Sequence, residues 1–350
     1  MKARKSTAQR ASLFALALFI PLACAACPKN NPPPQPNVRV SSPSRSVERL
    51  PPIPTSFNGE RALDHVRKQI AIGPRPPGSP ELAQTRAYIM DQLKSFGLNV
   101  SLDEFTTMTP LGEKKMANIV GELAGETKNV ILIASHYDTK YYKDMRFVGA
   151  NDPGASVGTL LEIGRVLGSM KDKQKFTYRL VFFDGEEAFC EGWDECNNEG
   201  QPDNTYGSRH YVLQLNEKKE LDHTRAMILL DMVGYKKLEL GRDTLSTRWL
   251  QHIVWETGRE LGHKKIFVDR EEGVGGDDHE PFLQAGIPAV DLIQLSSYPH
   301  WHTAEDTLDK ISAESMKIVG ETVIASLPKI VDKIEPQKGT KGTKGTEGTN

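Results

Sequence analysis

Three acidic residues follow an apolar run in the stretch RLVFFDGEEAFC, residues 179–190. Asp184, Glu186 and Glu187 come directly after residues that are typical of a buried strand. Carboxylates are costly to remove from water unless a cation or hydrogen-bond donors compensate them, and the adjacent glutamates repel each other. The segment therefore predicts a bound cation, with one glutamate as a ligand and its neighbour free to transfer protons.

Polar side chains also follow two other apolar runs. His136 and Asp138 end the run NVILIASHYD, and Asp231 follows the run RAMILL. A single carboxylate in such a position is often a helix N-cap, but three strands that end this way argue for a shared site. Ligands of parallel α/β sheets bind beyond the carboxyl ends of the strands, so we expect these side chains to converge.

The candidate metal ligands are histidines and carboxylates. They are His136, Asp138, Asp152, Glu186, Glu187, Asp231, Asp277, Asp278 and His302. Catalytic zinc takes such ligands and keeps a position open for water or substrate, whereas calcium prefers oxygen alone. His300 competes with His302 for the same role, and His279 is expected to support the ligands. The remaining histidines are expected to be structural or exposed.

Motifs of other enzyme classes lack the context that they require. HEPFL, residues 279–283, begins like a zincin helix, but its fifth residue is Leu283 and Pro281 is expected to break the helix. GASVG, residues 154–158, matches a serine-hydrolase elbow but follows a polar loop instead of a core strand. The chain has no phosphate-binding loop and no dinucleotide-binding glycine motif, so neither a serine hydrolase nor a nucleotide enzyme is expected.

The elements that must position these residues follow from the apolar patterns. Continuous apolar runs predict buried strands within 129–138, 177–187, 225–234 and 288–295, and two further strands are expected at 99–108 and 117–125. Helical spacing occurs at 60–72, 80–97, 154–170, 206–216, 245–262 and 312–334. This alternation predicts a single α/β domain whose central, mostly parallel sheet is flanked by helices.

The ends of the chain differ from its centre. Residues 1–27 combine a basic start, an apolar run and small residues, which is typical of a secretory signal peptide. Ordinary cleavage and lipid attachment at Cys24 or Cys27 are both open, so the protein is expected to be periplasmic, lipid-anchored or secreted. Any contact with a membrane would be made through that anchor.

Composition divides the rest of the chain. Residues 28–57, rich in Pro and Ser, predict a disordered linker, the KGT repeats of 336–350 predict a disordered tail, and 58–335 is the expected catalytic domain. The net charge of −2 argues against a nucleic-acid partner. Cys190 and Cys196 are candidates for a disulfide, with free thiols as the alternative.

The motifs taken together resemble a known family. SHYDTK, GANDPGAS, FFDGEEAF, YGSRH, LLDMVG, DDHEPFLQAGIPAVDLI and WHTAEDT occur in the order found in zinc aminopeptidases of the aminopeptidase Y and S type. They resemble even more closely the glutaminyl cyclases (glutaminyl-peptide cyclotransferases) of the same fold, over about residues 60–333. The resemblance implies a zinc-exopeptidase-like fold with a mixed sheet, and substrates that are peptide or protein N-termini. We expect a monomer.

The resemblance also implies a role for each candidate. Asp152, Glu187 and His302 would bind the catalytic Zn²⁺, and Glu186 would be the general acid and base. In the two-zinc aminopeptidases His136 and Asp231 would bind a second zinc ion, with Asp152 shared between the ions. The cyclases keep matching residues but work with one zinc ion, so the number of ligands does not separate the two activities.

Three details favour the cyclase. Asp277 stands where aminopeptidases usually have serine, and it matches a cyclase residue that acts with Asp231 in proton transfer. Trp301 and Trp193 match residues that line the pocket for the glutamine side chain. Against this, the loop around Trp193 is longer, and Asp291 stands where animal cyclases have histidine.

The expected reaction is therefore the conversion of an N-terminal glutamine into pyroglutamate with release of ammonia. The alternative is a two-zinc aminopeptidase that hydrolyses N-terminal residues from peptides. A non-enzymatic domain of this fold is disfavoured because the set of candidate ligands is complete.

Overall fold

The computed structural model describes residues 56–170, 172–190, 200 and 202–336. The predicted signal peptide, the tail from residue 337 and nearly all of the predicted linker lie outside these residues, as do Trp193 and Cys196. No helix in the described ranges is long and apolar enough to cross a membrane. Phe57, the last residue of the predicted linker, is buried against Gly320.

Six strands form one mixed sheet in the order β1-β2-β4-β3-β5-β8. Their bounds are β1 (Asn99–Thr109), β2 (Gly112–Leu123), β3 (Val130–His136), β4 (Thr177–Phe183), β5 (Thr224–Asp231) and β8 (Ala289–Ile293). β2 runs antiparallel to β1 and β4, whereas β4, β3, β5 and β8 are mutually parallel. The predicted, mostly parallel sheet is confirmed.

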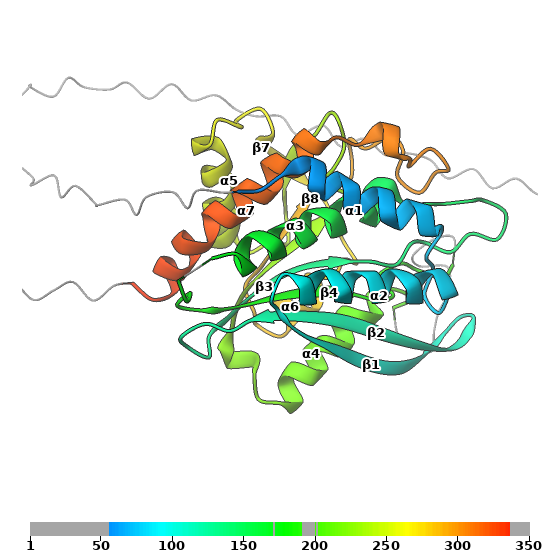
Figure 1. The fold of residues 1–350 in the computed structure, drawn as a ribbon, viewed down its shortest axis with the longest axis horizontal. Coiled ribbons are helices and arrows are strands. Elements are labelled where there is room, and N and C mark those ends of the chain that lie inside the picture. Colours follow the sequence, from blue (N-terminus) through cyan, green and yellow to red (C-terminus); the bar gives the residue numbers. More distant parts are fainter. Residues whose placement is uncertain (1–55, 171, 191–199, 201, 337–350) are drawn as a thin grey trace, which may run out of the picture. The chain divides into compact units, whose positions relative to one another are not determined.

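Helices cover both faces of the sheet (Figure 1). One layer contains α1 (Gly59–Ile72), α2 (Pro80–Ser95), α3 (Ser156–Gly168), α5 (Arg248–Glu260) and α7 (Ala313–Ile334). The other contains α4 (Tyr206–Glu217) and α6 (Glu280–Gln284). Alternate residues of β3 face opposite layers, since Ile131 and Ile133 belong to the first core and Leu132 and Ala134 to the second. Burial on both faces explains why the central strands read as continuous apolar runs.

The sequence patterns do not predict three short elements. β6 (Leu240–Asp243) and β7 (Phe267–Glu272) form a separate two-stranded parallel sheet, and α6 is the third. The expectation that Pro281 breaks a helix is wrong, because this residue lies in the first turn of α6. Backbone N–H groups have no intrahelical acceptor there, so proline is tolerated.

The parallel strands bring the polar residues to one edge. His136 is the last residue of β3 and Asp231 is the last residue of β5, while Glu186 and Glu187 lie in the loop after β4. The residues before α3 form a short π-helical turn, η1 (Ala150–Ala155), which contains Asp152. GASVG therefore begins within this turn, continues into α3 and does not follow a strand directly, as expected.

Candidate metal centre

Among the described residues three sets of side chains could hold metal ions: Asp277, His279 and Asp291 form one of them, and two overlapping sets lie at this edge. One set is His136, Asp152 and Asp231, and the other is Asp152, Glu187 and His302. Within each set the ligand atoms lie within 4.8 Å of one another. Asp152 belongs to both of these sets, so the structure brings together all five residues that the family resemblance implied as zinc ligands.

The spacing of these atoms suits a tetrahedral ion. Nε2 of His136 is 3.2 Å from Oδ1 of Asp152 and 3.4 Å from Oδ1 of Asp231. Nε2 of His302 is 3.2 Å from Oε1 of Glu187 and 3.5 Å from Oδ2 of Asp152. Ligand atoms at the usual zinc distances lie roughly 3.3 to 3.6 Å apart in a tetrahedron.

Buried polar atoms without hydrogen-bond partners also indicate that a cation binds here. Both ring nitrogens of His136, Oε2 of Glu187 and Oδ1 of Asp231 have no hydrogen-bond partner among the described residues. All three side chains are buried. Native proteins rarely leave such atoms unpaired, and histidine with carboxylates is the donor set of catalytic zinc. These residues therefore fit a zinc ion.

The charges of the cluster are strongly coupled. Burial raises the pKa of Glu186 well above its ordinary value, with His136 opposing this and Glu187 adding to it. Burial likewise raises the pKa of Asp231 to about 7, although the contact with His136 opposes the shift. Burial would lower the pKa of His302, but Glu187 and Asp152 outweigh it and raise that pKa to about 9. Protons and a metal ion therefore compete for this cluster.

Asp138 fixes the two glutamates and is in neither ligand set. Its carboxylate accepts the backbone N–H groups of Glu186 at 3.1 Å and Glu187 at 3.2 Å. Glu187 contacts His302, whereas Oε2 of Glu186 lies 3.8 Å from Nδ1 of His136. The adjacent carboxylates thus take different places, one in a ligand set and one beside it.

Asp184, the first carboxylate of the same segment, is satisfied elsewhere. Its Oδ2 accepts hydrogen bonds from Arg86 at 2.9 Å, the backbone N–H of Ala117 at 2.9 Å and the hydroxyl of Tyr137 at 3.2 Å. The compensating cation for this residue is therefore a guanidinium group and not a metal ion. Of the three carboxylates that sequence reasoning grouped together, only the two glutamates lie at the candidate metal centre.

Asp306 supports the centre and was missed by sequence reasoning. It accepts the backbone N–H groups of Asn151 at 2.9 Å and Asp152 at 3.0 Å, and the hydroxyl of Tyr298 donates to it at 2.6 Å. These bonds fix the turn that carries Asp152. Its place in WHTAEDT, shortly after His302, was the available signal. His300 contacts Glu305 at 3.1 Å and is in neither ligand set.

A cavity of about 260 Å³ adjoins both ligand sets. Its wall includes Glu186, Asp277 and Trp301, together with apolar side chains from Val274, Ile293 and Leu295. The Trp301 ring stacks on His302 with a centroid distance of 4.2 Å. The prediction for Trp193 falls outside the described residues. Cys190 is disulfide-bonded, and the other predicted partner, Cys196, is not among the described residues.

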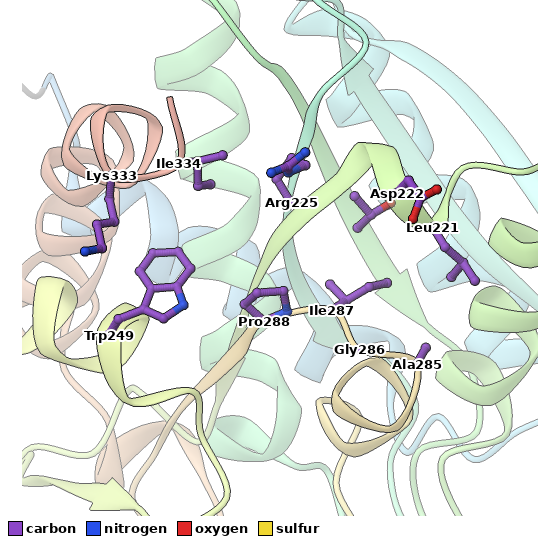
Figure 2. Close-up of a pocket in the computed structure, with 11 residues that line it drawn as sticks. Leu221, Asp222, Arg225, Trp249, Ala285, Gly286, Ile287, Pro288, Lys333 and Ile334 are labelled. Atoms are coloured by element: carbon purple, nitrogen blue, oxygen red, sulfur yellow. The ribbon is translucent and has the colours of Figure 1, made fainter. Parts of the chain in front are cut away.

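A larger groove of about 650 Å³ lies at the amino ends of β5 and β8 (Figure 2). Arg225, Trp249, Pro288 and Lys333 line it. This is the opposite end of β5 from Asp231, and the groove includes no member of either ligand set. Convergent polar groups therefore identify the candidate site better than size does.

The chain is similar in sequence to known enzymes. The profile of Peptidase family M28 matches residues 118–327. The glutaminyl-peptide cyclotransferase of Bos taurus is 31% identical over 283 residues, which cover 69% of this chain and 75% of that protein. The matched family region includes all five candidate ligands.

Solved structures agree in fold. The glutaminyl cyclase of an Acidobacteriales bacterium has a TM-score of 0.75 and 35% identity, covering 81% of this chain and 98% of that one. A Zn-dependent exopeptidase from Parabacteroides distasonis has a TM-score of 0.70 and 27% identity, covering 77% of this chain and 97% of that one. The zinc-exopeptidase-like fold implied by the sequence motifs is confirmed.

Proposed function

The chain belongs to peptidase family M28, and from that premise we propose that it is a zinc-dependent glutaminyl-peptide cyclotransferase. It converts an N-terminal glutamine into pyroglutamate and releases ammonia. One observation carries the proposal: Glu186, Asp231 and Asp277 share the wall of one cavity beside the candidate metal ligands. Similarity to glutaminyl cyclases at 31% and 35% identity supports it.

The metal would be held by Asp152, Glu187 and His302. When bound, zinc supplies a Lewis acid that polarises the γ-amide carbonyl of the substrate glutamine. His136 and Asp231 offer a second position that shares Asp152. One ion is sufficient for cyclisation in this proposal, because the nucleophile belongs to the substrate itself.

Glu186 would move the proton. It lines the cavity without belonging to a ligand set, and burial raises its pKa, so it can hold a proton near neutral pH. It accepts a proton from the α-amine as that nitrogen bonds to the γ-carbonyl carbon. It then gives the proton to the amide nitrogen as the C–N bond breaks and ammonia leaves. The attack is intramolecular, so the substrate supplies the proximity.

The other residues that line the cavity match the α-amino group and the side chain of an N-terminal glutamine. Asp231 and Asp277 offer carboxylates to the α-amino group, which is cationic before it loses its proton. Trp301, Val274 and Leu295 offer apolar surface to the methylene groups of the side chain. Peptide and protein N-termini are therefore the proposed substrates.

A two-zinc aminopeptidase is the second candidate function. It is favoured by the complete second set, His136, Asp152 and Asp231, and by the exopeptidase among the similar structures. Glu186 would then accept a proton from the water that attacks the first peptide carbonyl. The same residues serve both reactions, so only a measurement of products separates them.

We also propose that the enzyme is exported and acts as a monomer. The proposal of export depends on the signal-like pattern of residues 1–27, with lipid attachment at Cys24 or Cys27 as the alternative to release.

Mass spectrometry of two matched peptides tests the function. The zinc-loaded protein is incubated with a peptide that begins with glutamine and with one that begins with leucine. Loss of ammonia from the first and no change in the second are expected. Stepwise loss of residues from the leucine peptide would instead make the protein an aminopeptidase. The Glu186→Gln variant is the control for contaminating enzymes.

A further inference from the structure

The mouth of the cavity beside the candidate metal ligands contains two glycines. Residues 273–277, with the sequence GVGGD, follow β7 and line this cavity. Most of the residues that line it are buried, whereas Gly273, Gly275 and Trp301 are exposed. These three residues therefore mark the opening through which a substrate enters.

The fold does not require a glycine at position 273 or 275. Glycine is needed where φ is positive or where a side chain would collide with its surroundings. Neither residue has a positive φ. A Cβ atom at Gly273 would meet no atom within 4 Å, and one at Gly275 would meet only Oε1 of Glu280, at 4.0 Å. Every other described glycine whose Cβ atom would lie in open space has a positive φ.

The segment is fixed at both of its ends. The backbone N–H of Thr244 donates to the carbonyl of Glu272, the last residue of β7, at 3.0 Å. The backbone N–H of Gly276 donates to Oε1 of Glu280 at 2.9 Å, and the side-chain amide of Asn204 donates to the carbonyl of Gly276. Residues 273–275 therefore span two anchored points.

The side chain of Val274 holds the middle of the segment against the protein. It is 6% exposed and packs in an apolar cluster with Met232, Ile293 and Tyr298. The backbone on either side of it is exposed, because Gly273 and Gly275 have no side chains to cover it. A surface that is ordered before binding costs less entropy when a ligand binds to it.

The backbone groups of this segment have no partners within the described ranges. The N–H and C=O groups of Gly273, Val274 and Gly275 make no hydrogen bond to any residue there. Exposed main-chain segments of this kind bind extended peptides through backbone hydrogen bonds. Glycine also lets another backbone approach closely.

The cavity gives independent evidence that a ligand lies beside the segment. Glu187, Asp231 and Asp277 line it, and their exposed fractions are 2%, 7% and 4%. Each has a carboxylate oxygen without a hydrogen-bond partner among the described residues, so the cavity needs cationic occupants. Its volume of about 260 Å³ is below the roughly 300 to 1,000 Å³ of most ligand pockets. The first residue of a peptide fits inside, and the rest must pass the mouth.

We propose that the backbone of residues 273–275 binds the main chain of the second and third residues of the substrate, and that Gly273 and Gly275 keep the mouth open for it. The inference rests on the proposed function for the identity of the first residue, which is glutamine. Main-chain contacts do not depend on side chains. The substrate class is therefore peptides and protein N-termini in which an extended segment of any sequence follows the glutamine.

Three substrates test binding of the main chain. They are a peptide of one glutamine followed by three alanines, the same peptide with the nitrogens of its second and third residues methylated, and glutamine amide. Methylation removes two hydrogen-bond donors, so KM should rise roughly 10-fold while kcat stays within about twofold. Glutamine amide should have a KM at least as high as that of the methylated peptide. Equal KM values for all three substrates would overturn the proposal.

Two substitutions together test the role of the glycines. Gly273→Leu with Gly275→Leu places side chains over the backbone, and the open space and ordinary φ at both positions should let this variant fold. KM for the tetrapeptide should rise 10-fold or more, whereas KM for glutamine amide should rise less than threefold. Glu271→Leu is the matched control, because Glu271 is exposed on β7 but does not line the cavity. Equal increases for both substrates, or none for the tetrapeptide, would contradict the proposal.

Binding to an inactive protein separates this inference from the proposed reaction. Calorimetry on the Glu186→Gln variant compares the affinities of the tetrapeptide and its methylated form, and of matched peptides that begin with leucine. A loss of affinity of about 10-fold on methylation is expected. If methylation weakens binding while the active enzyme forms no pyroglutamate, the main-chain site stands and the proposed function fails. If pyroglutamate forms and methylation leaves affinity unchanged, the main-chain site is wrong.

Discussion

Two buried clusters in this protein use the same residue types differently. At the candidate metal centre, Nε2 of His136 faces both Asp152 and Asp231. At the second cluster, Nε2 of His279 faces Asp243 and Nδ1 faces Asp291. The nitrogen–oxygen distances are 3.2 and 3.4 Å in the first case and 3.2 and 4.0 Å in the second. Residue types alone therefore do not distinguish the two clusters, and Asp277, His279 and Asp291 of the second cluster also lie within 4.8 Å of one another.

The difference follows from what surrounds each histidine. Both ring nitrogens of His136 face carboxylates, and no backbone donors compensate Asp231 at its unpaired Oδ1. Asp243, by contrast, is already held by backbone N–H groups and the Ser246 hydroxyl. The contrast holds for Asp243 only, because both oxygens of Asp291 and both ring nitrogens of His279 have no hydrogen-bond partner among the described residues.

The largest expected effect separates the clusters by their metal. His302→Ala removes a proposed ligand, so zinc should be lost and turnover should fall by at least about 10³-fold. His279→Gln, in the second cluster, should keep its zinc. Metal content per chain, measured by mass spectrometry of the purified proteins, checks both variants. Retention of zinc by His302→Ala would contradict the ligand assignment.

The next largest effect distinguishes the roles of the two adjacent glutamates, Glu186 and Glu187. Glu186→Gln should keep zinc and lower kcat by roughly 10²- to 10⁴-fold, because it removes a proton-transfer group and no ligand. Glu187→Gln should instead lose zinc. Turnover of a glutamine peptide and metal content are measured on both variants, and a reversal of the two results would exchange the roles.

A smaller effect compares the cavity beside the candidate metal ligands with the groove of Figure 2. Trp301→Ala should raise KM for a glutamine peptide by roughly 10-fold, since burial of an aromatic surface against the substrate is worth one to two kcal/mol. Trp249→Ala, in the groove of Figure 2, should leave KM unchanged. Steady-state kinetics with both variants decide whether substrate uses the smaller, polar cavity.

The smallest effect concerns stability and compares two histidines. Burial lowers the pKa of His65 from 6.5 to about 4, and its ring hydrogen-bonds to Tyr88 at 2.6 Å. The unfolded chain therefore binds more protons than the folded one between these values, so stability falls as pH decreases from 6.5 to 4. The total loss is about 3 kcal/mol. His65→Gln should remove this part of the pH dependence of the free energy of unfolding, measured by urea unfolding from pH 4 to 8.

His279 should show the opposite sign. The contact with Asp243 outweighs burial and raises its pKa above 6.5, so its contribution to stability is complete below 6.5. That contribution is lost as pH rises through the raised value. In His279→Gln, the free energy of unfolding should therefore depend less on pH above pH 6.5, and its dependence on pH near pH 5 should be unchanged. Equal slopes in both variants would contradict the assignment of the protonated state.

Sequence reasoning located the candidate centre because one rule of the fold applies to it. The carboxyl ends of parallel strands meet at the same edge of a sheet, and His136, Glu187 and Asp231 all follow apolar strand patterns. The family motifs added Asp152 and His302, which no strand pattern marks. The roles of all five as ligands stay predictions.

The same reasoning failed where side-chain direction mattered. Asp184 follows a core strand as closely as the two glutamates do, yet it pairs with Arg86 from α2. Asp243 ends β6, an element with no clear pattern in the sequence, and it reaches His279 across 36 positions of the chain. Asp306 likewise bonds to the turn that carries Asp152 from a distant loop.

The sequence by itself therefore determined the α/β architecture, the family and the types of side chain at the sheet edge. These depend on apolar periodicity and on motif order, which are local properties of the chain. Only the tertiary structure decided which carboxylate faces a histidine and which one faces a guanidinium group. Those outcomes depend on the distances between side chains of loops remote in sequence. Differences of a few tenths of an ångström matter there, because Coulomb and hydrogen-bond energies in a buried site change steeply with distance.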